Sequence, residues 1–225
     1  MREAIETSGP TKDLRAACIE EGLAIIEAEG LEKLSMREVA RRLGVSHQAP
    51  YKHFASRDHV LAAIIAQAYD DFAAHLEARS RVAGADDPHE ELRRMGEAYF
   101  EYAAAHPLQY RLMFNTALPD PATHPAMMAK ADRCYALLRE SVAKLEHVKA
   151  AKAPKKQGEL DALFIWTAIH GLASALQSDT IDVIGLSPTT LRAAAPHLLN
   201  RIGDAMAVAG IGGGDGDDEA DDAGP

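Results

Sequence analysis

Residues 35–58 read SMREVARRLGVSHQAPYKHFASRD, and this stretch predicts two short helices joined by a tight turn. Ser35 is followed three residues later by Glu38, which is the capping-box pattern that opens a helix. Gly44 stands where a helix end needs a left-handed residue, and Ser46 is a suitable cap for a second helix over 46–53. This spacing favours a helix-turn-helix, whose second helix enters the major groove of DNA.

The side chains of this stretch suit such a motif, with one departure. Ala40 is small enough to let the two helices approach, and we expect Val45 to fill the corner between them. Pro50 has no N–H to donate to the carbonyl of Ser46, so the second helix is expected to start late or to be tight. The outward residues have groups that can donate to bases or phosphates: Ser46, His47, Gln48 and Lys52.

The net charge of −10 is distributed unevenly along the chain. Residues 33–57 contain six cationic side chains and one acid, Glu38, whereas residues 212–225 contain six acids and no cation. The acidic total therefore does not exclude DNA binding; it leaves one basic segment on the predicted motif.

The composition predicts an all-helical protein. Alanine accounts for 43 of the 225 residues and is the best helix former but a poor strand former. The two cysteines, Cys18 and Cys134, form no disulfide framework, and no run of 18 apolar residues is present. A cytoplasmic protein without a membrane span or signal peptide is expected, and no metal, cofactor or catalytic constellation is predicted.

Capping and proline positions outside the motif predict about nine helices in all. We expect a flexible arm over 1–10, a three-helix DNA-binding domain over 11–56, a helical domain over 57–208 and a disordered acidic tail over 209–225. Residues 178–187 are predicted to form a loop, and Pro196 to begin the last helix. The stretch 159–177 is nearly apolar all round, so we expect it to be buried on most sides.

The motif residues 35–40, 43–46, 51–54 and 56–58 resemble those of the TetR/AcrR family of bacterial transcriptional regulators. Residues 106–114 and 166–171 also resemble the subgroup of that family with a Trp…His-Gly signature in its ligand domain. The resemblance implies a DNA-binding head on a helical effector-binding body that forms a homodimer through 159–177 and 196–208.

The resemblance also implies roles for individual residues of the head. Ser46, His47 and Gln48 would meet base edges, with Gln48 suited to bidentate recognition of adenine. Phosphate contacts, which position the protein without reading the sequence, are expected from Ser35, Arg37, Tyr51, His53 and Arg57.

Aromatic residues of the second domain have two possible interpretations. They either line an effector pocket with a few polar tips or pack in an ordinary core. Trp166 and His170 share a helix face, and His106 could line the pocket or cap a turn. The candidate ligand-binding residues are Tyr99, Tyr102, His106, Tyr110, Met113, Phe114, Trp166 and His170.

Together these features predict a repressor that a small, largely apolar effector releases from a palindromic operator. Two alternatives are a helix-turn-helix regulator controlled by a protein partner, through the acidic tail for example, and a small helical enzyme using His106 or His170. No reaction can be written for the enzyme, because the sequence lacks a nucleophile, metal or paired-carboxylate pattern.

Overall fold

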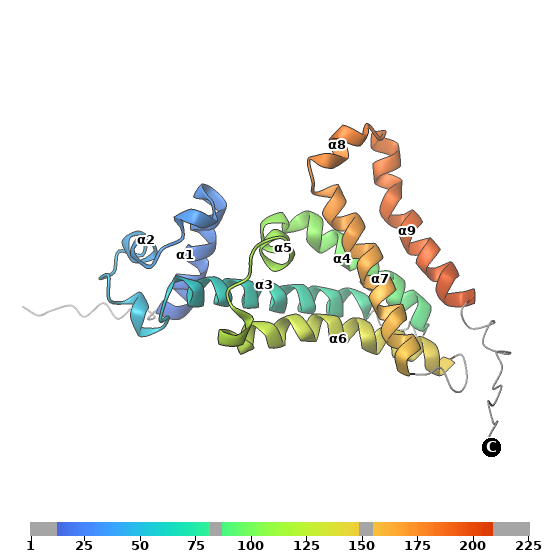
Figure 1. Cartoon of the computed structure of the whole chain (residues 1–225), viewed down its shortest axis with the longest axis horizontal. Helices are drawn as coiled ribbons and strands as arrows, with labels where there is room; N and C mark the ends of the chain where they lie inside the picture. The colour runs from blue at the N-terminus through green and yellow to red at the C-terminus, as the bar shows by residue number, and fades with distance from the viewer. Residues whose placement is uncertain (1–12, 82–86, 149–154, 209–225) are drawn as a thin grey trace, which may run out of the picture. The chain divides into compact units, whose positions relative to one another are not determined.

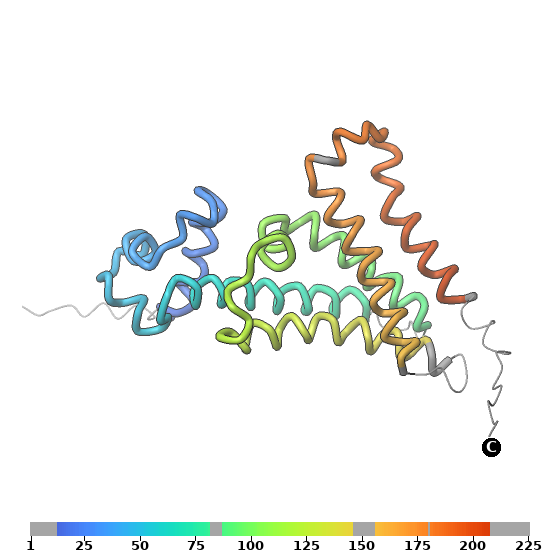
Figure 2. The backbone as a smooth tube through the Cα atoms, in the orientation of Figure 1, coloured from blue at the N-terminus to red at the C-terminus, as the bar shows by residue number. Residues whose placement is uncertain are grey.

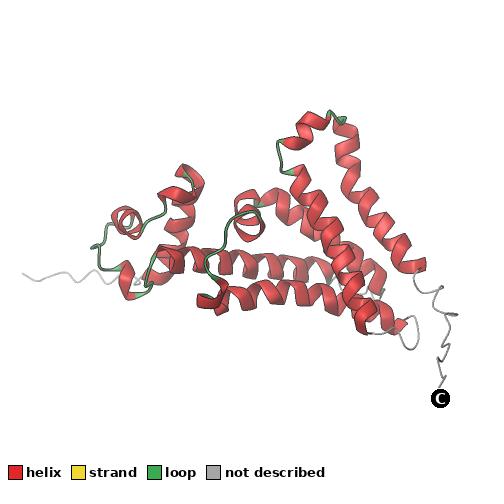
Figure 3. Ribbon diagram, in the orientation of Figure 1, coloured by secondary structure: helices red, strands yellow, loops and turns green. Residues whose placement is uncertain are grey.

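The computed structural model describes residues 13–81, 87–148 and 155–208, and every regular element in these ranges is a helix (Figure 3). The predicted all-α fold is confirmed, with nine α-helices among the described residues. The predicted arm over 1–10 and the predicted tail over 209–225 lie outside these ranges. The α-helices are α1 (Leu14–Glu29), α2 (Met36–Arg42), α3 (Arg57–Ser80), α4 (Pro88–Ala105), α5 (Pro107–Phe114), α6 (Pro125–Val148), α7 (Lys155–Leu176), α8 (Thr180–Ile184) and α9 (Pro188–Val208).

The chain divides into two compact units, one of residues 1–75 and 105–136 and the other of residues 76–104 and 137–225. The helices α3 and α6 each contribute residues to both units, and Figure 2 shows each as an uninterrupted coil. The domain boundary predicted at residues 56 and 57 falls inside the first unit and stays a prediction.

In the first unit, α1 has a capping residue at each end. The carboxylate of Asp13 accepts a hydrogen bond from the N–H of Arg15, and Gly30 ends the helix with a φ of 98°. Gly22 lies in contact with α3, because a Cβ there would be 2.9 Å from Cδ1 of Ile64. The absence of a side chain therefore leaves room for Ile64, at a cost of about 1 kcal/mol for glycine inside a helix.

The helix α2 has the predicted signals at both ends. Oγ of Ser35 accepts from the N–H of Glu38 at 3.1 Å, and Gly44 has a φ of 66°. The N–H of Val45 donates to the carbonyl of Ala40, and the N–H of Gly44 donates to that of Arg41, which is the paired pattern of a Schellman end. Val45, however, is 36% exposed, so the prediction that it fills the corner is wrong.

The predicted α-helix over 46–53 is also wrong, because this segment is a turn followed by the 3₁₀ helix η2 (Pro50–Lys52). The physical reason is Pro50, which cannot donate to the carbonyl of Ser46. That carbonyl accepts instead from the N–H of Ala49 at 2.9 Å, and the next two bonds, from the N–H groups of Lys52 and His53, also span three residues. The expectation of a tight segment is therefore confirmed.

In the second unit, α7 and α9 lie side by side, and α8 forms the turn that joins them (Figure 1). The helix α8 replaces the loop predicted over 178–187. The helix α9 begins at Pro188 and runs through Pro196, which was expected to start it. Pro196 and Arg192 are both exposed, so water can satisfy the carbonyl that loses its partner at this turn.

The helix α7 is less buried than its sequence suggested. Leu160, Leu163 and Phe164 are 50%, 46% and 47% exposed, so the prediction of burial on most sides does not hold for the single chain. No helix in the described ranges is both long and apolar enough to span a membrane.

Candidate nucleic-acid interface and effector region

Six of the nine side chains predicted to contact DNA belong to the turn over 46–53, and the other three lie at the starts of α2 and α3. Eight of the nine are exposed, and Arg57 is half-buried. Tyr51 is 51% exposed, so its ring and hydroxyl are accessible to a partner. The exposed residues are Ser35, Arg37, Ser46, His47, Gln48, Tyr51, Lys52 and His53.

Buried residues at either end of this turn hold it in place. Pro50 is buried, and its carbonyl accepts from the N–H groups of both His53 and Phe54 at 3.0 Å. Phe54 is 4% exposed, and the guanidinium of Arg15 lies 5.5 Å from its ring centre. The tight turn therefore has a hydrophobic anchor on its inner side while its polar residues face outward.

Ion pairs of Glu38 leave fewer free positive charges on the head than the sequence count suggested. Its carboxylate does not reach back to the cap but accepts from Nε of Arg41 at 2.8 Å and from Nε of Arg42 at 3.1 Å. These hydrogen bonds, from Arg41 first, lower the pKa of Glu38 to about 2. Arg42 also binds Glu21 and Glu29 of α1, which lie outside the basic window of the sequence. With Arg57, which lies beside Asp58, three of the six cations are therefore paired with carboxylates.

Arg37 and Lys52 differ from these paired arginines. Both are exposed, and among the described residues neither has an ion-pair partner. An unpaired surface cation keeps its charge available to a phosphate, and each phosphate neutralised makes binding more dependent on salt. The basic face of the head therefore depends on fewer residues than the sequence count suggested.

Arg57 has a different environment from the other predicted phosphate contacts. Its Nε donates to the carbonyl of Leu34 at 2.9 Å, and its Nη2 donates to that of Leu31 at 2.8 Å. Its Nη1 lies 3.3 Å from a carboxylate oxygen of Asp58. The guanidinium thus connects the start of α3 to η1 (Leu31–Lys33), the short helix that follows α1.

The candidate ligand-binding residues of the first unit lie mainly in an aromatic core. Tyr110 is fully buried, and its ring centre lies 5.0 Å from that of Phe114. The hydroxyl of Tyr69 donates to the carbonyl of Met113 at 2.9 Å. His106 is exposed at the start of α5, and its side chain makes no capping bond there. This environment favours the core interpretation for Tyr110, Met113 and Phe114.

The candidates of the second unit form a cluster with polar groups. The hydroxyl of Tyr99 lies 3.0 Å from Nδ1 of His170, and Trp166 stacks on the imidazole with ring centres 5.3 Å apart. Oγ of Ser174 lies 3.4 Å from the other ring nitrogen of His170. Tyr102 is buried in the same unit. The structure thus brings Tyr99, Trp166 and His170 together, and their role in ligand binding stays a prediction.

Burial lowers the pKa of His170 below its ordinary value of 6.5. The unfolded chain then binds a proton more readily than the folded protein, so we expect this residue to reduce stability as the pH falls below 6.5. An NMR titration of the imidazole should give a folded-state pKa below 6.5, and His170→Gln should remove this part of the pH dependence. A titration at or above the ordinary value would contradict the expectation.

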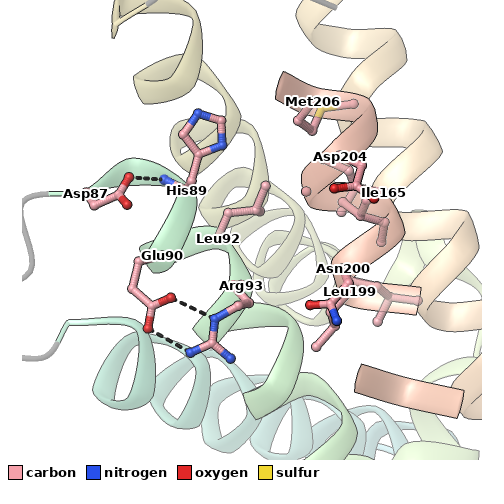
Figure 4. A pocket seen from close by; sticks show the side chains of 13 residues that line it. Asp87, His89, Glu90, Leu92, Arg93, Ile165, Leu199, Asn200, Asp204 and Met206 are labelled. Atoms are coloured by element: carbon pink, nitrogen blue, oxygen red, sulfur yellow. Dashed lines mark hydrogen bonds and ion pairs between the residues drawn. The ribbon is translucent and has the colours of Figure 1, made fainter. Parts of the chain in front are cut away.

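A separate pocket of about 580 Å³ lies between α4, α7 and α9 (Figure 4). Ile165, Ile169 and Leu199 contribute apolar side chains to it, and Asp87, Glu90 and Asp204 contribute carboxylates. The side chain of Glu90 binds Arg93 at its edge, as the dashed lines show. No predicted ligand-binding residue lines this pocket, and sequence patterns gave no signal for it.

Two family models match the chain in succession. The model described as "Bacterial regulatory proteins, tetR family" matches residues 19–64, and the one described as "Tetracyclin repressor-like, C-terminal domain" matches residues 92–202. These matches leave the Trp…His-Gly subgroup as a prediction.

Curated relatives agree with these matches. An HTH-type transcriptional regulator of Mycobacterium tuberculosis is 26% identical over 108 residues, which cover 48% of this chain and 46% of that protein. The match therefore spans just under half the length of that relative. An uncharacterized HTH-type regulator of the same species is 27% identical over 177 residues, 78% of this chain and 75% of its own. Both relatives are named as HTH-type transcriptional regulators, in agreement with the prediction of a DNA-binding regulator.

Solved structures show the same fold. A Rhodococcus protein of unknown function superimposes with a TM-score of 0.71 at 21% identity, covering 91% of this chain and 98% of that one. The regulator PfmR from Thermus thermophilus gives a TM-score of 0.55 at 22% identity, covering 84% and 96%. At these identities the likeness concerns the fold alone.

Proposed function

Because the chain belongs to the TetR family of bacterial regulatory proteins, we propose that it is a DNA-binding repressor released from a palindromic operator by a small, largely apolar effector. One observation carries the proposal. The polar residues Ser46, His47 and Gln48 are exposed on a tight turn that buried Pro50 and Phe54 anchor from behind.

The proposed contacts with DNA are of two kinds: some recognise bases, and others bind phosphates and position the protein on the duplex. Ser46, His47 and Gln48 read base edges, with the Gln48 amide both donating to and accepting from adenine. Arg37 and Lys52 bind phosphates, because their charges are not neutralised by described residues of the head. Ser35, Tyr51 and His53 add hydrogen bonds to the backbone of the duplex.

Two heads are needed for a palindromic operator, and α7 offers the surface that joins them. Leu160, Leu163 and Phe164 are about half exposed, a combination that is unfavourable for an isolated chain in water. A two-fold interface through 159–177 and 196–208 covers these side chains with their own counterparts. Effector binding beside Tyr99, Trp166 and His170 then favours a spacing of the heads that does not fit DNA.

Selection of duplexes from a random pool tests the proposal. We expect an inverted repeat, with Gln48→Ala weakening binding by about 1–3 kcal/mol per half-site and relaxing the preference at one base pair. Gln67→Ala is the matched control, since Gln67 is an exposed glutamine on α3 that bonds to Asp71. Binding without sequence preference, equal for both variants and the wild type, would refute the proposed function.

A further inference from the structure

Two polar atoms in the second unit are buried without a hydrogen-bond partner among the described residues. One is Oγ of Ser141, whose residue is 1% exposed, and the other is Nη1 of Arg94. Leaving a buried donor unsatisfied is costly, and native proteins do so rarely. Each such atom therefore needs an explanation in terms of what it binds.

The register of α4 and α6 places the two residues at the same level. These helices run in opposite directions (Figure 1), and Nζ of Lys144 binds Oε1 of Glu91 at 2.6 Å. Arg94 follows Glu91 by three residues on α4, and Ser141 precedes Lys144 by three residues on α6. Residues three apart share a helix face, so Arg94 and Ser141 lie one turn from the ion pair, on facing helices.

The charge of Arg94 is only partly compensated. Its Nε donates to Oε1 of Glu90 at 2.8 Å, but the same carboxylate also accepts two bonds from Arg93, each at 2.7 Å. One carboxylate is thus shared between two guanidinium groups. The buried Nη1 of Arg94 therefore remains available to donate a hydrogen bond, and the guanidinium keeps part of its positive charge uncompensated.

The two atoms together define the chemistry of their partner. A guanidinium N–H only donates, and a serine hydroxyl can donate at the same time, so the complementary group is an anionic acceptor with two oxygens. Residues close to them in sequence on the same helices, Met95 and Ala98 on α4 and Val142 and Leu145 on α6, are buried and apolar. Such surroundings favour an apolar chain behind the anionic group and disfavour a highly hydrated ion.

We propose that Arg94 and Ser141 bind the carboxylate of the effector, which is therefore an organic acid with an apolar body. This inference rests on the proposed function, because it assumes that a small molecule acts on the second unit. It adds a chemical class for the effector and two residues that recognise it. Neither residue lines the pocket of Figure 4.

If the hydroxyl of Ser141 serves to bind a ligand, its removal should affect the stability of the free protein differently than if it supports the fold. Removing a buried hydroxyl without a partner relieves its desolvation cost, so Ser141→Ala should leave the melting temperature of the free protein unchanged or higher. If the hydroxyl supported the fold instead, the same change would lower the melting temperature. The two roles therefore differ in the sign of the change.

The experiment measures binding of acetate, benzoate, decanoate and 1-decanol to the full chain by calorimetry and thermal melting, without DNA. We expect at least one apolar carboxylate to bind, the alcohol to bind more weakly, and Arg94→Gln to weaken carboxylate binding by roughly tenfold or more. Ser141→Ala should weaken it roughly threefold to tenfold. Arg192→Gln is the matched control, because Arg192 is an exposed arginine of α9 that bonds to Thr189, and this variant should bind as the wild type does.

Two results would overturn the inference. One is that no carboxylate of the series binds, which would leave ordered water as the partner of both atoms. The other is that binding is equal in wild type, Arg94→Gln and Ser141→Ala. Because binding is measured without DNA, a failed operator selection would count against the proposed function and leave this result standing. Operator binding by the free protein, conversely, does not depend on a carboxylate.

Discussion

Replacing Leu163 and Phe164 by glutamate should convert the protein to a monomer and weaken operator binding by about 10²–10⁴-fold. The two side chains are 46% and 47% exposed on α7, so they contribute little to the core of their own chain. In a two-fold dimer of the variant each carboxylate would be buried near the same carboxylates of the other copy, without a cation to pair with. A buried unpaired charge costs several kcal/mol, which exceeds what a modest interface can offset.

The loss of affinity follows from the loss of the second head. Once one head is bound, the other binds its half-site as an intramolecular event, and this advantage disappears when the protomers separate. Sedimentation measures the oligomeric state, and titration of a labelled operator measures the affinity. Circular dichroism should show unchanged helix content, because the substituted positions are exposed.

Val183→Glu is the matched control for this experiment. Val183 is an apolar residue of α8 with 86% exposure, and it lies outside the two stretches assigned to the interface. The same chemical change there should leave both the dimer and operator binding intact. A double variant that remains dimeric and binds the operator as tightly as the wild type would contradict the proposed interface.

The parts of the fold that could be predicted from the sequence depend on local chemistry. Ser35 caps α2 and Gly44 ends it in both the prediction and the structure, because capping is decided within a few residues. The segment after Gly44 was less accessible to prediction. Pro50 indicated a tight turn, but the pattern alone could not show that an entire helix would be replaced by a turn and a 3₁₀ helix.

Features that depend on contacts between distant residues could not be predicted. The basic window of residues 33–57 omitted Glu21 and Glu29, which lie on α1 and bind Arg42. The eight candidate ligand-binding residues are divided between two compact units, a division that periodicity does not reveal. Arg94 and Ser141 gave no signal either, since a polar residue on an amphipathic helix normally faces water.

Arg57→Ala should lower the melting temperature by roughly 5–10 °C, because it removes two charge-assisted hydrogen bonds worth about 2–3 kcal/mol together. These bonds connect the start of α3 to the carbonyls of Leu31 and Leu34, which lie on the opposite side of the helix-turn-helix segment in sequence. Their loss removes the guanidinium donor from both carbonyls, although Leu31 still accepts from the N–H of Leu34, and it frees one end of the head. Operator affinity should then fall because the exposed turn is no longer held in place.

Salt dependence separates this role from the phosphate contact expected from the sequence. Arg37→Ala removes the same charge from an exposed position, so it should keep the melting temperature and reduce the salt slope by about 0.9 per protomer. We expect Arg57→Ala to show the opposite combination, a lower melting temperature and a nearly unchanged slope. A normal melting temperature with a reduced slope would instead assign Arg57 to a phosphate. The outcome depends on whether the two remaining N–H groups of this guanidinium can reach a phosphate, because the other three are directed at Leu34, Leu31 and Asp58.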